Sequence, residues 1–500
     1  MLKPLGLLAL ALVLSACRAQ TGAPGPRATA DGNLRYGELT FKPCALSVKR
    51  MDAVEAQCAT LSVPENHDEP NGRKIDLAIA LVVAQGQAEP DPIIMITGGP
   101  GQSALESYPM VAQAFDDARR NRNVLLVDAR GTGGSHPLKC EDDKGNGSLT
   151  NKDDASPKAA GAFAERCRDA LAKTSDLRYY ATGDHIRDLD LVRQKLGIDH
   201  LNLFGVSYGT RVAQQYAKRY PKHTRTVTLD SVVPNSLVLG QEHARNLDAA
   251  LRLQFARCRE DAACTHNLGD PGAQLDAVRT RLRAGNLPLV RYRDPVSGDW
   301  RSDAPAYSHL GLLLRLYAYQ PEAASLLPLI VHDASEGRYE GLLAQARSLS
   351  SDVSDAIMHG MELSVMCTED GELAADPADA GTLMGTEFVD FARAQCAVWP
   401  KGERAADFRA PLAGDLPVLV LSGEFDPVTP PRYGTEVIKS LPNGRHLILP
   451  GQGHSVLGIG CMPKLFAQFI EKADAKSLDE TCLKRLNATP PFAGNYGWEP

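Results

Sequence analysis

A serine between two glycines, in residues 205–209 (Gly-Val-Ser-Tyr-Gly), is the feature of this sequence that most directly indicates chemistry. The apolar residues 201–204 before it are typical of a buried strand, and residues 210–220 after it are typical of a helix. A sharp strand-to-helix turn exposes a serine hydroxyl at the end of a sheet, and flanking glycines let neighbouring backbone approach closely. We therefore predict that Ser207 is a nucleophile; the alternative is a purely structural turn.

A serine attacks well only when a base removes its proton and an acid orients that base. After a turn of this kind the partners follow later strands, in the order serine, acid, histidine. Residues 417–422 and 445–449 have the apolar pattern of buried strands. Asp426 follows the first of these strands and His454 follows the second, so we predict them as the acid and the base.

Both partners have competitors in the sequence. Glu424 lies two residues before Asp426 and could serve as the acid, while Asp426 could simply be a turn residue before Pro427. His446 is a second histidine, but it lies inside the strand pattern of residues 445–449. His454 is preceded by a glycine in the loop beyond that strand, where it can fold back towards the serine.

Backbone N–H groups should stabilise the negative charge of the tetrahedral intermediate. One donor is expected from Tyr208, the residue after the nucleophile, and the other from an earlier strand-to-loop turn. The apolar residues 93–96 lead into such a turn, with the sequence Thr-Gly-Gly-Pro-Gly at residues 97–101. We predict Gly99 as the second donor, with Gly98 as the alternative.

Four runs together resemble the α/β-hydrolases of the proline iminopeptidase and tripeptidyl aminopeptidase group of serine exopeptidases. They are residues 97–101, 128–135 (Asp-Ala-Arg-Gly-Thr-Gly-Gly-Ser), 205–210 and 423–430 (Gly-Glu-Phe-Asp-Pro-Val-Thr-Pro). The last run resembles the larger, secreted tripeptidyl aminopeptidase-like branch, and the likeness spans roughly residues 40–485. Two positions depart from the family pattern: Thr97 replaces a histidine of the oxyanion loop, and Ala129 replaces a glutamine.

The resemblance implies an aminopeptidase acting on peptides with a free N-terminus, with no metal or organic cofactor. Such an enzyme needs an acidic group in a partly dry pocket to bind the substrate ammonium. Glu362, Glu369 and Asp370 are the candidates; the alternative is a solvated acidic loop beside a disulfide. For Asp128 and Arg130 we expect a structural role in holding a turn.

The order of elements predicts an α/β-hydrolase fold, in which a mostly parallel sheet is flanked by helices. Strand patterns alternate with helices up to residue 235, stop, and resume near residue 416. The intervening segment has a mainly helical pattern and is expected to cover the active site as a cap. The predicted parts are a first core half (36–235), the cap (236–408), a second core half (409–488) and a C-terminal tail (489–500).

The N-terminus has the features of a lipoprotein signal peptide. Residues 1–16 contain Lys3 and an apolar stretch too short to span a bilayer, and they end in Leu-Ser-Ala before Cys17. This ending resembles a bacterial lipobox, which predicts lipidation of Cys17 and a flexible tether over residues 17–35. Arg18 then favours attachment to the outer membrane, facing the periplasm. The alternative is an ordinary cleaved signal peptide.

An exported chain enters an oxidising compartment, and ten of the 11 cysteines remain once Cys17 is set aside. Spacing does not determine connectivity, so we adopt the pairing of sequence neighbours as a hypothesis. The pairs are Cys44–Cys58, Cys140–Cys167, Cys258–Cys264, Cys367–Cys396 and Cys461–Cys482. The cysteines are widely scattered and form no zinc-binding spacing, so we expect no metal site.

The composition narrows the class of function. The chain has 500 residues and a net charge of -7, with no basic run, which argues against a nucleic-acid partner. Three rival functions stay open. An esterase uses the same triad, a surface-binding lipoprotein could keep the scaffold without turnover, and a haloalkane-type or epoxide hydrolase would need aspartate in place of Ser207.

Overall fold

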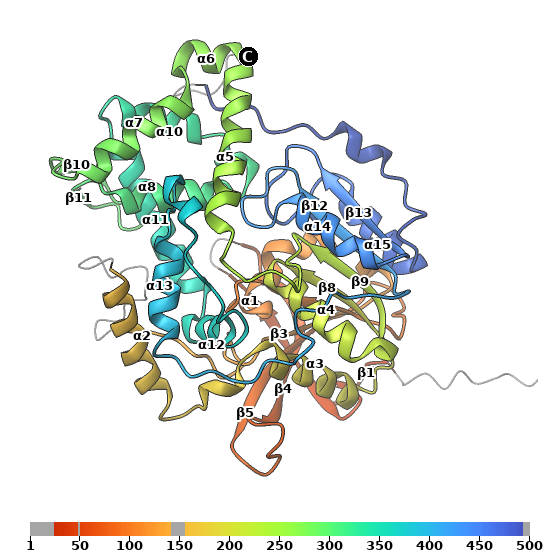
Figure 1. Ribbon diagram of the computed structural model, residues 1–500. Coiled ribbons are helices and arrows are strands. Elements are labelled where there is room, and N and C mark those ends of the chain that lie inside the picture. The colour runs from red at the N-terminus through yellow and green to blue at the C-terminus, as the bar shows by residue number, and fades with distance from the viewer. Residues whose placement is uncertain (1–24, 49–50, 142–155, 494–500) are drawn as a thin grey trace, which may run out of the picture.

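The computed structural model describes residues 25–48, 51–141 and 156–493, and Figure 1 shows their arrangement. The strands are β1 (Arg27–Ala28), β2 (Leu34–Tyr36), β3 (Leu39–Leu46), β4 (Val54–Pro64), β5 (Lys74–Val82), β6 (Ile93–Ile96), β7 (Val124–Val127), β8 (Leu201–Val206), β9 (Thr224–Asp230), β10 (Val290–Arg293), β11 (Trp300–Asp303), β12 (Val418–Gly423) and β13 (Gly444–Leu449).

The α-helices are α1 (Ala104–Val111), α2 (Pro157–Leu171), α3 (Thr182–Leu196), α4 (Tyr208–Arg219), α5 (His243–Glu260), α6 (Ala262–Leu268), α7 (Pro271–Ala284), α8 (Tyr307–Tyr317), α9 (Pro321–Ala324), α10 (Leu327–Ser335), α11 (Glu340–Ala356), α12 (His359–Glu369), α13 (Glu387–Cys396), α14 (Pro431–Val437) and α15 (Met462–Lys472). Short 3₁₀ turns are η1 (Ala112–Phe115), η2 (Ala118–Arg120), η3 (Leu177–Tyr179), η4 (Pro221–His223), η5 (Pro377–Gly381), η6 (Ile438–Ser440) and η7 (Thr481–Arg485).

The described residues form an 11-stranded sheet in the order β1-β2-β3-β4-β5-β7-β6-β8-β9-β12-β13. Strands β7, β6, β8, β9, β12 and β13 are parallel, whereas β1 to β5 pair antiparallel at the other edge. Strands β6, β7 and β12 are buried throughout, as expected for strands covered by helices on both faces. The predicted α/β class with a mostly parallel central sheet is confirmed.

Two apolar layers hold the sheet between helices. On one face, residues of α3, α4 and α14 pack on the sheet, and Met361, Leu363 and Val365 of α12 join them. On the other face, Tyr108 of α1 and Phe466 and Phe469 of α15 pack on the strands. The carboxyl ends of β6, β8, β9, β12 and β13 are therefore fixed beside one another, as a site assembled from their loops requires.

The chain between β9 and β12 is mainly helical and rises above the sheet (Figure 1). Helices α5, α7, α8, α10 and α11 share their own apolar core, in which Leu247, Leu313 and Leu327 are buried. Two features were not indicated by the sequence. A two-stranded hairpin, β10–β11, lies within this segment, and α12 packs into the core of the sheet rather than into the core of the cap.

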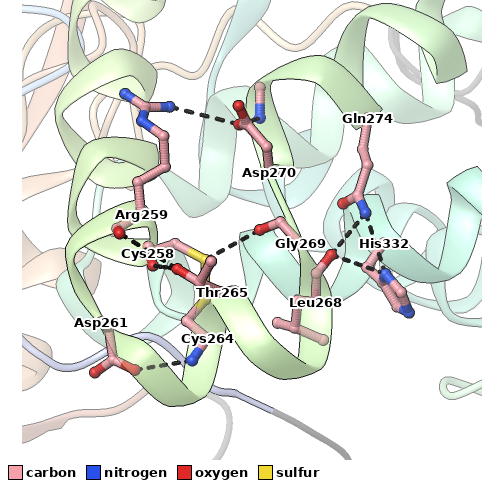
Figure 2. The surroundings of a disulfide bond; sticks show 11 residues. Cys258, Arg259, Asp261, Cys264, Thr265, Leu268, Gly269, Asp270, Gln274 and His332 are labelled. Atoms are coloured by element: carbon pink, nitrogen blue, oxygen red, sulfur yellow. Dashed lines mark hydrogen bonds and ion pairs between the residues drawn. A yellow bond between two sulfur atoms is a disulfide. The ribbon is translucent and has the colours of Figure 1, made fainter.

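Five disulfide bonds join cysteines of the described residues, and they join the pairs that the neighbour hypothesis named: Cys44–Cys58, Cys140–Cys167, Cys258–Cys264, Cys367–Cys396 and Cys461–Cys482. Figure 2 shows Cys258–Cys264 at the junction of α5 and α6, where the Asp261 carboxylate accepts a hydrogen bond of 2.8 Å from the Cys264 N–H. Such a set of disulfides is typical of an exported protein.

The two ends of the described chain are more structured than the sequence indicated. Strands β1 and β2 pair within the stretch assigned to a tether. Near the other end, Ala493 is buried beside the Cys258–Cys264 bond, so the first residues of the expected tail pack on the cap. Cys17 lies outside the described residues, and none of the helices described is long and apolar enough to cross a bilayer.

Candidate active site

Ser207 occupies a strained turn between β8 and α4. Its φ of 55° and ψ of -126° lie in a region that non-glycine residues rarely adopt. The neighbouring sheet holds this conformation, because the Ser207 N–H donates to the Asp230 carbonyl at 2.9 Å. The conformation is that of an elbow that presents a serine at the end of a strand.

The two glycines of the elbow are required by close backbone contacts. A Cβ at Gly205 would lie 2.4 Å from the Gly209 carbonyl oxygen, and a Cβ at Gly209 would lie 2.2 Å from the Ile96 carbonyl oxygen. Both distances are far inside van der Waals contact, so no larger residue fits without moving backbone. These contacts bring α4 against β6 and place the oxyanion loop beside Ser207.

Asp426 and His454 meet in the loops after β12 and β13. The Asp426 Oδ2 lies 2.8 Å from the His454 Nδ1, and both side chains are buried. Asp426 also accepts hydrogen bonds from the N–H groups of Val428 and Thr429 and from the Thr429 hydroxyl at 2.8–2.9 Å. The carboxylate is thereby fixed against one imidazole nitrogen, which leaves Nε2 for the serine side.

The charges of this pair stabilise each other. Burial alone would raise the pKa of Asp426, but the charge of His454 and hydrogen bonds from His454, Thr429 and Val428 outweigh it and lower the pKa to about 2. Burial alone would lower the pKa of His454, but the charge and hydrogen bond of Asp426, together with the charge of Asp230, raise it. The pair is thus built to favour an imidazolium beside a carboxylate.

Glu424 and His446, the alternatives named from the sequence, make contacts away from Ser207. Glu424 is exposed and accepts a hydrogen bond of 2.7 Å from the Gly451 N–H. His446 lies on β13, with its Nε2 2.9 Å from the Ser422 hydroxyl, and burial lowers its pKa to about 4. Neither lines the cavity that contains Ser207 and His454.

The predicted oxyanion loop lies against the nucleophile. A Cβ built on Gly98 would be 2.9 Å from the Ser207 Cβ, and Gly99, with φ of 99°, lines the same cavity as Ser207. Tyr208 is the first residue of α4, so its N–H has no partner within the helix. The Thr97 hydroxyl donates to the Gln102 carbonyl at 3.0 Å and closes the loop in place of the family histidine.

Asp128 and Arg130 hold the turn beside the oxyanion loop, as the sequence suggested. The buried Asp128 accepts hydrogen bonds from the Ser103 hydroxyl and from the N–H groups of Leu105 and Gly134 at 2.7–3.0 Å. Arg130 is fully buried and forms a bidentate pair with Asp188 at 2.6 and 2.7 Å. Neither side chain lines the cavity, so both act on the scaffold.

Ser207 and His454 open into a cavity of about 1880 Å³ between the sheet and the cap. Its walls include apolar residues of α8, α12 and α13 and of the core, among them Leu312, Leu316, Leu363, Phe388, Phe391 and Phe204. Cavities of a few hundred to a thousand Å³ already enclose drug-sized ligands. This one has room for several residues of a peptide.

The three predicted amine-binding carboxylates separate into two groups. Glu362 lines the cavity, and its Oε2 lies 2.7 Å from the His359 Nδ1. Glu369 and Asp370 do not line it. Asp370 pairs with Arg211 of α4 at 2.9 Å, and Glu369 accepts a hydrogen bond from the Thr182 N–H at 2.6 Å. Their carboxylates are used inside the protein, so of the three candidates only Glu362 lines the cavity.

Glu369 keeps one buried carboxylate oxygen without a hydrogen bond among the described residues. Its Oε2 lies 3.8 Å from Arg211 and has no hydrogen-bond partner among the described residues. Burial raises the pKa of Glu369 to about 7, against the opposing charge of Arg211. The sequence did not indicate that Arg211 contacts Glu369 and Asp370. Arg211 lies in the helix after Ser207, and these two carboxylates are more than 150 positions away in the sequence.

Two further contacts at the site were also missed. The Tyr319 carbonyl accepts a hydrogen bond of 2.7 Å from the backbone N–H of His454. The Tyr319 ring packs edge-on against the imidazole, with 5.0 Å between the ring centroids. Asp230 lies at the end of β9 and contacts the loop that carries His454. Its position at the carboxyl end of a central parallel strand was a signal that could have identified it.

Comparisons with known proteins identify the fold family of the chain. The family model of the alpha/beta hydrolase fold matches residues 91–459. Serine protease Hip1 of Mycobacterium tuberculosis is 26% identical over an alignment 502 positions long, which covers 93% of this chain and 94% of that protein. Tripeptidyl aminopeptidase of Streptomyces coelicolor is 25% identical, covering 87% of this chain and 84% of the relative.

Two other matches complete the comparison. Carboxylesterase B of Mycobacterium tuberculosis is 28% identical, covering 84% of this chain and 85% of the relative. Among solved structures, the proline iminopeptidase of Mycobacterium smegmatis aligns with a TM-score of 0.34 and 15% identity, covering 83% of this chain and 93% of that chain.

The elbow contacts predict that Gly209→Ala destabilises the protein. The added Cβ would meet the Ile96 carbonyl, and relieving that overlap should cost about 3 kcal/mol of the free energy of unfolding. Gly183→Ala in α3 is the matched control, because a Cβ there meets no atom within 4 Å. Urea unfolding of both variants measures the difference. Equal stability of the two would show that the elbow tolerates a side chain.

The Asp426–His454 pair predicts a change in pH dependence. His454 must be neutral to act as base, so kcat/KM should rise with pH through its raised pKa. Asp426→Asn removes the stabilising charge, so it should move this acid limb to lower pH and reduce kcat by about 10³–10⁴-fold. Glu424→Gln is the control and should change kcat by less than about threefold. A larger loss in Glu424→Gln would identify Glu424 as the acid.

Proposed function

The chain belongs to the alpha/beta hydrolase fold family, and on this premise we propose that it is a serine aminopeptidase that releases one to three residues from the N-terminus of peptides. As an enzyme it is a serine hydrolase, with relatives named as a serine protease and a tripeptidyl aminopeptidase. The proposal assigns the nucleophile, base and acid to Ser207, His454 and Asp426. It assigns the oxyanion donors to the N–H groups of Tyr208 and Gly99.

The mechanism follows from these assignments. His454 takes the hydroxyl proton as the Ser207 Oγ attacks the scissile carbonyl, and Asp426 stabilises the imidazolium. The N–H groups of Tyr208 and Gly99 donate to the developing oxyanion. His454 then gives its proton to the leaving amine, the C–N bond breaks, and an acyl-enzyme ester on Ser207 remains. Water, activated by His454, hydrolyses this ester and restores the serine.

The observation that carries the exopeptidase assignment is the position of Glu362 in the cavity. The Met358 N–H donates to the Gly101 carbonyl of the oxyanion loop at 2.9 Å. Glu362 follows Met358 by four residues, which is about 6 Å along a helix. An extended peptide covers about 3.3–3.6 Å per residue. A substrate ammonium at Glu362 would therefore leave only a short segment before the scissile carbonyl.

The charge environment of Glu362 suits an ammonium. The carboxylate is about one quarter exposed and has His359 as its ion-pair partner, which carries a charge only when it is protonated. The His359 Nε2 in turn lies 2.9 Å from the Gln395 Nε2, and all three residues line the cavity. Among the described residues, His359 is the ion-pair partner of the Glu362 carboxylate, so a substrate ammonium can add a full positive charge beside it.

An esterase is the second candidate function. Carboxylesterase B is among the relatives, and much of the cavity wall is apolar, which suits an uncharged acyl group. The same triad cleaves esters and amides, so the substrate has to be decided by experiment. A surface-binding protein without turnover is a third possibility, which the same experiment addresses.

The proposed location follows from the N-terminus and the disulfides. We infer that Cys17 is lipidated and anchors the protein to the outer membrane, facing the periplasm. The disulfides of the described chain are typical of an exported protein. The proposed partners are peptide substrates with a free N-terminus and, through the lipid, the membrane.

The test of the aminopeptidase assignment uses chromogenic peptides of one to three residues with free or acetylated N-termini, and a simple ester. We expect turnover of free-amine peptides, little or none of acetylated peptides, and a loss of at least about 10³-fold in Ser207→Ala. Turnover of the ester alone would establish the esterase. Absence of turnover on every substrate by a folded wild type, with Ser207→Ala binding peptides equally well, would establish a binding protein.

A second prediction concerns Glu362. Glu362→Gln should raise KM for free-amine peptides by about tenfold, since it removes the charge that attracts the ammonium, and should leave kcat on any acetylated peptide unchanged. Glu372→Gln is the matched control, because it removes the same charge near the end of α12 from a residue that pairs with Arg404 outside the cavity. An equal effect of both variants would mean that net charge, rather than a specific contact, sets KM.

A further inference from the structure

Asp230 ends the central strand β9 and is fully buried, yet it has no role in the triad. It is paired with Val206 of β8 on one side and with Leu421 of β12 on the other. Its position is therefore between the strand that carries the nucleophile and the strand that carries the acid. A buried carboxylate in such a place requires compensating hydrogen bonds.

The N–H groups that compensate Asp230 come from the loop that carries the histidine, and the Ser231 hydroxyl also lies 3.5 Å from its Oδ1. The Val456 N–H lies 3.0 Å from both carboxylate oxygens of Asp230, and the Leu457 N–H lies 2.9 Å from Oδ2. Ser231 directly follows Asp230 in the sequence. Its hydroxyl accepts a hydrogen bond of 2.8 Å from the Ser455 N–H. Three consecutive N–H groups after His454 are thus held by two adjacent side chains.

The backbone around these contacts is strained on both sides. Ser231 has φ of 57° and Ser455 has φ of 69°, both in the left-handed region that favours glycine. The Ser231 N–H donates to the Leu421 carbonyl at 2.9 Å, which anchors the strained residue to β12. Strain of this kind persists only where surrounding contacts enforce it, and it occurs most often at functional sites.

The main chain of Asp230 acts on the other half of the catalytic pair. Its carbonyl accepts the Ser207 N–H at 2.9 Å, at the strained elbow. One residue therefore fixes the backbone of the nucleophile through its carbonyl and the backbone after the base through its carboxylate. Asp230 therefore contributes to the relative position of Ser207 and His454, together with the contacts that Asp426 and Tyr319 make to His454.

We propose that Asp230 and Ser231 are positioning residues that set the placement of His454 relative to Ser207 by binding the N–H groups of residues 455–457. The inference rests on the proposed roles of Ser207 and His454. Neither residue touches the reacting atoms. Both act through the histidine loop, whose displacement by 1 Å would cost about 100-fold in rate.

An amide cannot replace the Asp230 carboxylate. The carboxylate offers two acceptor oxygens to converging N–H groups, whereas asparagine would turn one NH₂ donor towards them. Even if the amide oxygen took the Oδ2 position and accepted from both N–H groups, the NH₂ would lie about 3.0 Å from the Val456 N–H, a donor facing a donor, and the loop would move to relieve this repulsion. Asp230→Asn is therefore a test of position that preserves side-chain size.

The charge of Asp230 supplies a second, independent readout. The groups that face His454 are Asp426 from the β12 loop, Asp230 from β9, Tyr319 from the cap and His243 from α5. The positive charge of Arg315 in α8 acts to lower the pKa values of Tyr319 and His243. Of them, Asp426 and Asp230 raise the pKa of His454, although burial opposes them. Burial raises the pKa of Asp230 itself to about 6, opposed by the hydrogen bonds from Val456 and Leu457 and by the charge of His454.

The experiment compares wild type with Asp230→Asn, Ser231→Ala and the matched control Asp294→Asn. Asp294 is also a buried carboxylate that accepts backbone N–H groups, from Val296 and Ser297, but it lies in the β10–β11 hairpin. The first readout is the rate of labelling by a fluorophosphonate, in which the Ser207 Oγ bonds to phosphorus, fluoride leaves, and the hydroxyl proton passes to His454. The second is kcat and KM for a free-amine peptide from pH 5 to 9, with thermal unfolding as a check on folding.

For Asp230→Asn we expect labelling and kcat to fall about 100-fold, KM to stay within about threefold, and the acid limb of kcat/KM to move to lower pH. Ser231→Ala should lower kcat by about fivefold and leave the acid limb in place, because it removes the hydrogen bonds with Ser455 and Asp230 and no charge. Asp294→Asn should match wild type in both readouts.

A folded Asp230→Asn that is labelled at the wild-type rate, with an unmoved acid limb, would overturn the inference. If Asp230→Asn fails to fold, Ser231→Ala decides, and wild-type kcat in that variant would overturn it. Failure of the proposed function looks different. A wild type that is labelled on Ser207 but cuts no free-amine peptide refutes the aminopeptidase, while the labelling rates still test the positioning. A wild type that is not labelled refutes both.

Discussion

The close approach of α4 to β6 is the contact on which the rest of the site depends. Gly209 lies so near the Ile96 carbonyl that no side chain fits, and in the same turn Ser207 has a positive φ of 55°. Parallel strands buried on both faces provide the rigidity to hold that strain. The strained residue is also the one whose hydroxyl must reach into the cavity, so strain and exposure have the same structural origin.

Several features of the molecule could be predicted because they are local. The elbow at residues 205–209, the strand before it and the glycine loop at residues 97–101 are contiguous patterns with a direct physical meaning. The positions of Asp426 and His454 follow from the rule that such residues lie beyond the carboxyl ends of parallel strands. Cysteines that follow one another in the sequence are also the disulfide partners, since each pair joins segments that the fold keeps close.

The remaining features depend on contacts between distant segments. Glu369 and Asp370 are carboxylates, the residue type expected for amine binding. Arg211 of α4, however, forms an ion pair with Asp370 at 2.9 Å. Nothing in the pattern around residue 370 indicates this partner, because the pairing arises only when α12 packs on the sheet. Glu362, on the same helix, points to the cavity instead. Side-chain direction on a helix depends on which neighbours cover it, and that is a property of the whole fold.

The same reasoning changes how the cap is understood. A cap that only covered the site could move away without disturbing the triad. Here the Tyr319 carbonyl binds the His454 N–H, and Met358 binds the oxyanion loop at Gly101. His454 is therefore supported from the cap at Tyr319 as well as from the sheet, whereas the glycine loop is supported from the N-terminal end of α12, which packs on the sheet. If His454 has its proposed role, movement of the cap at Tyr319 would loosen the base as well as open the cavity, so substrate entry and the assembly of the site would be physically coupled.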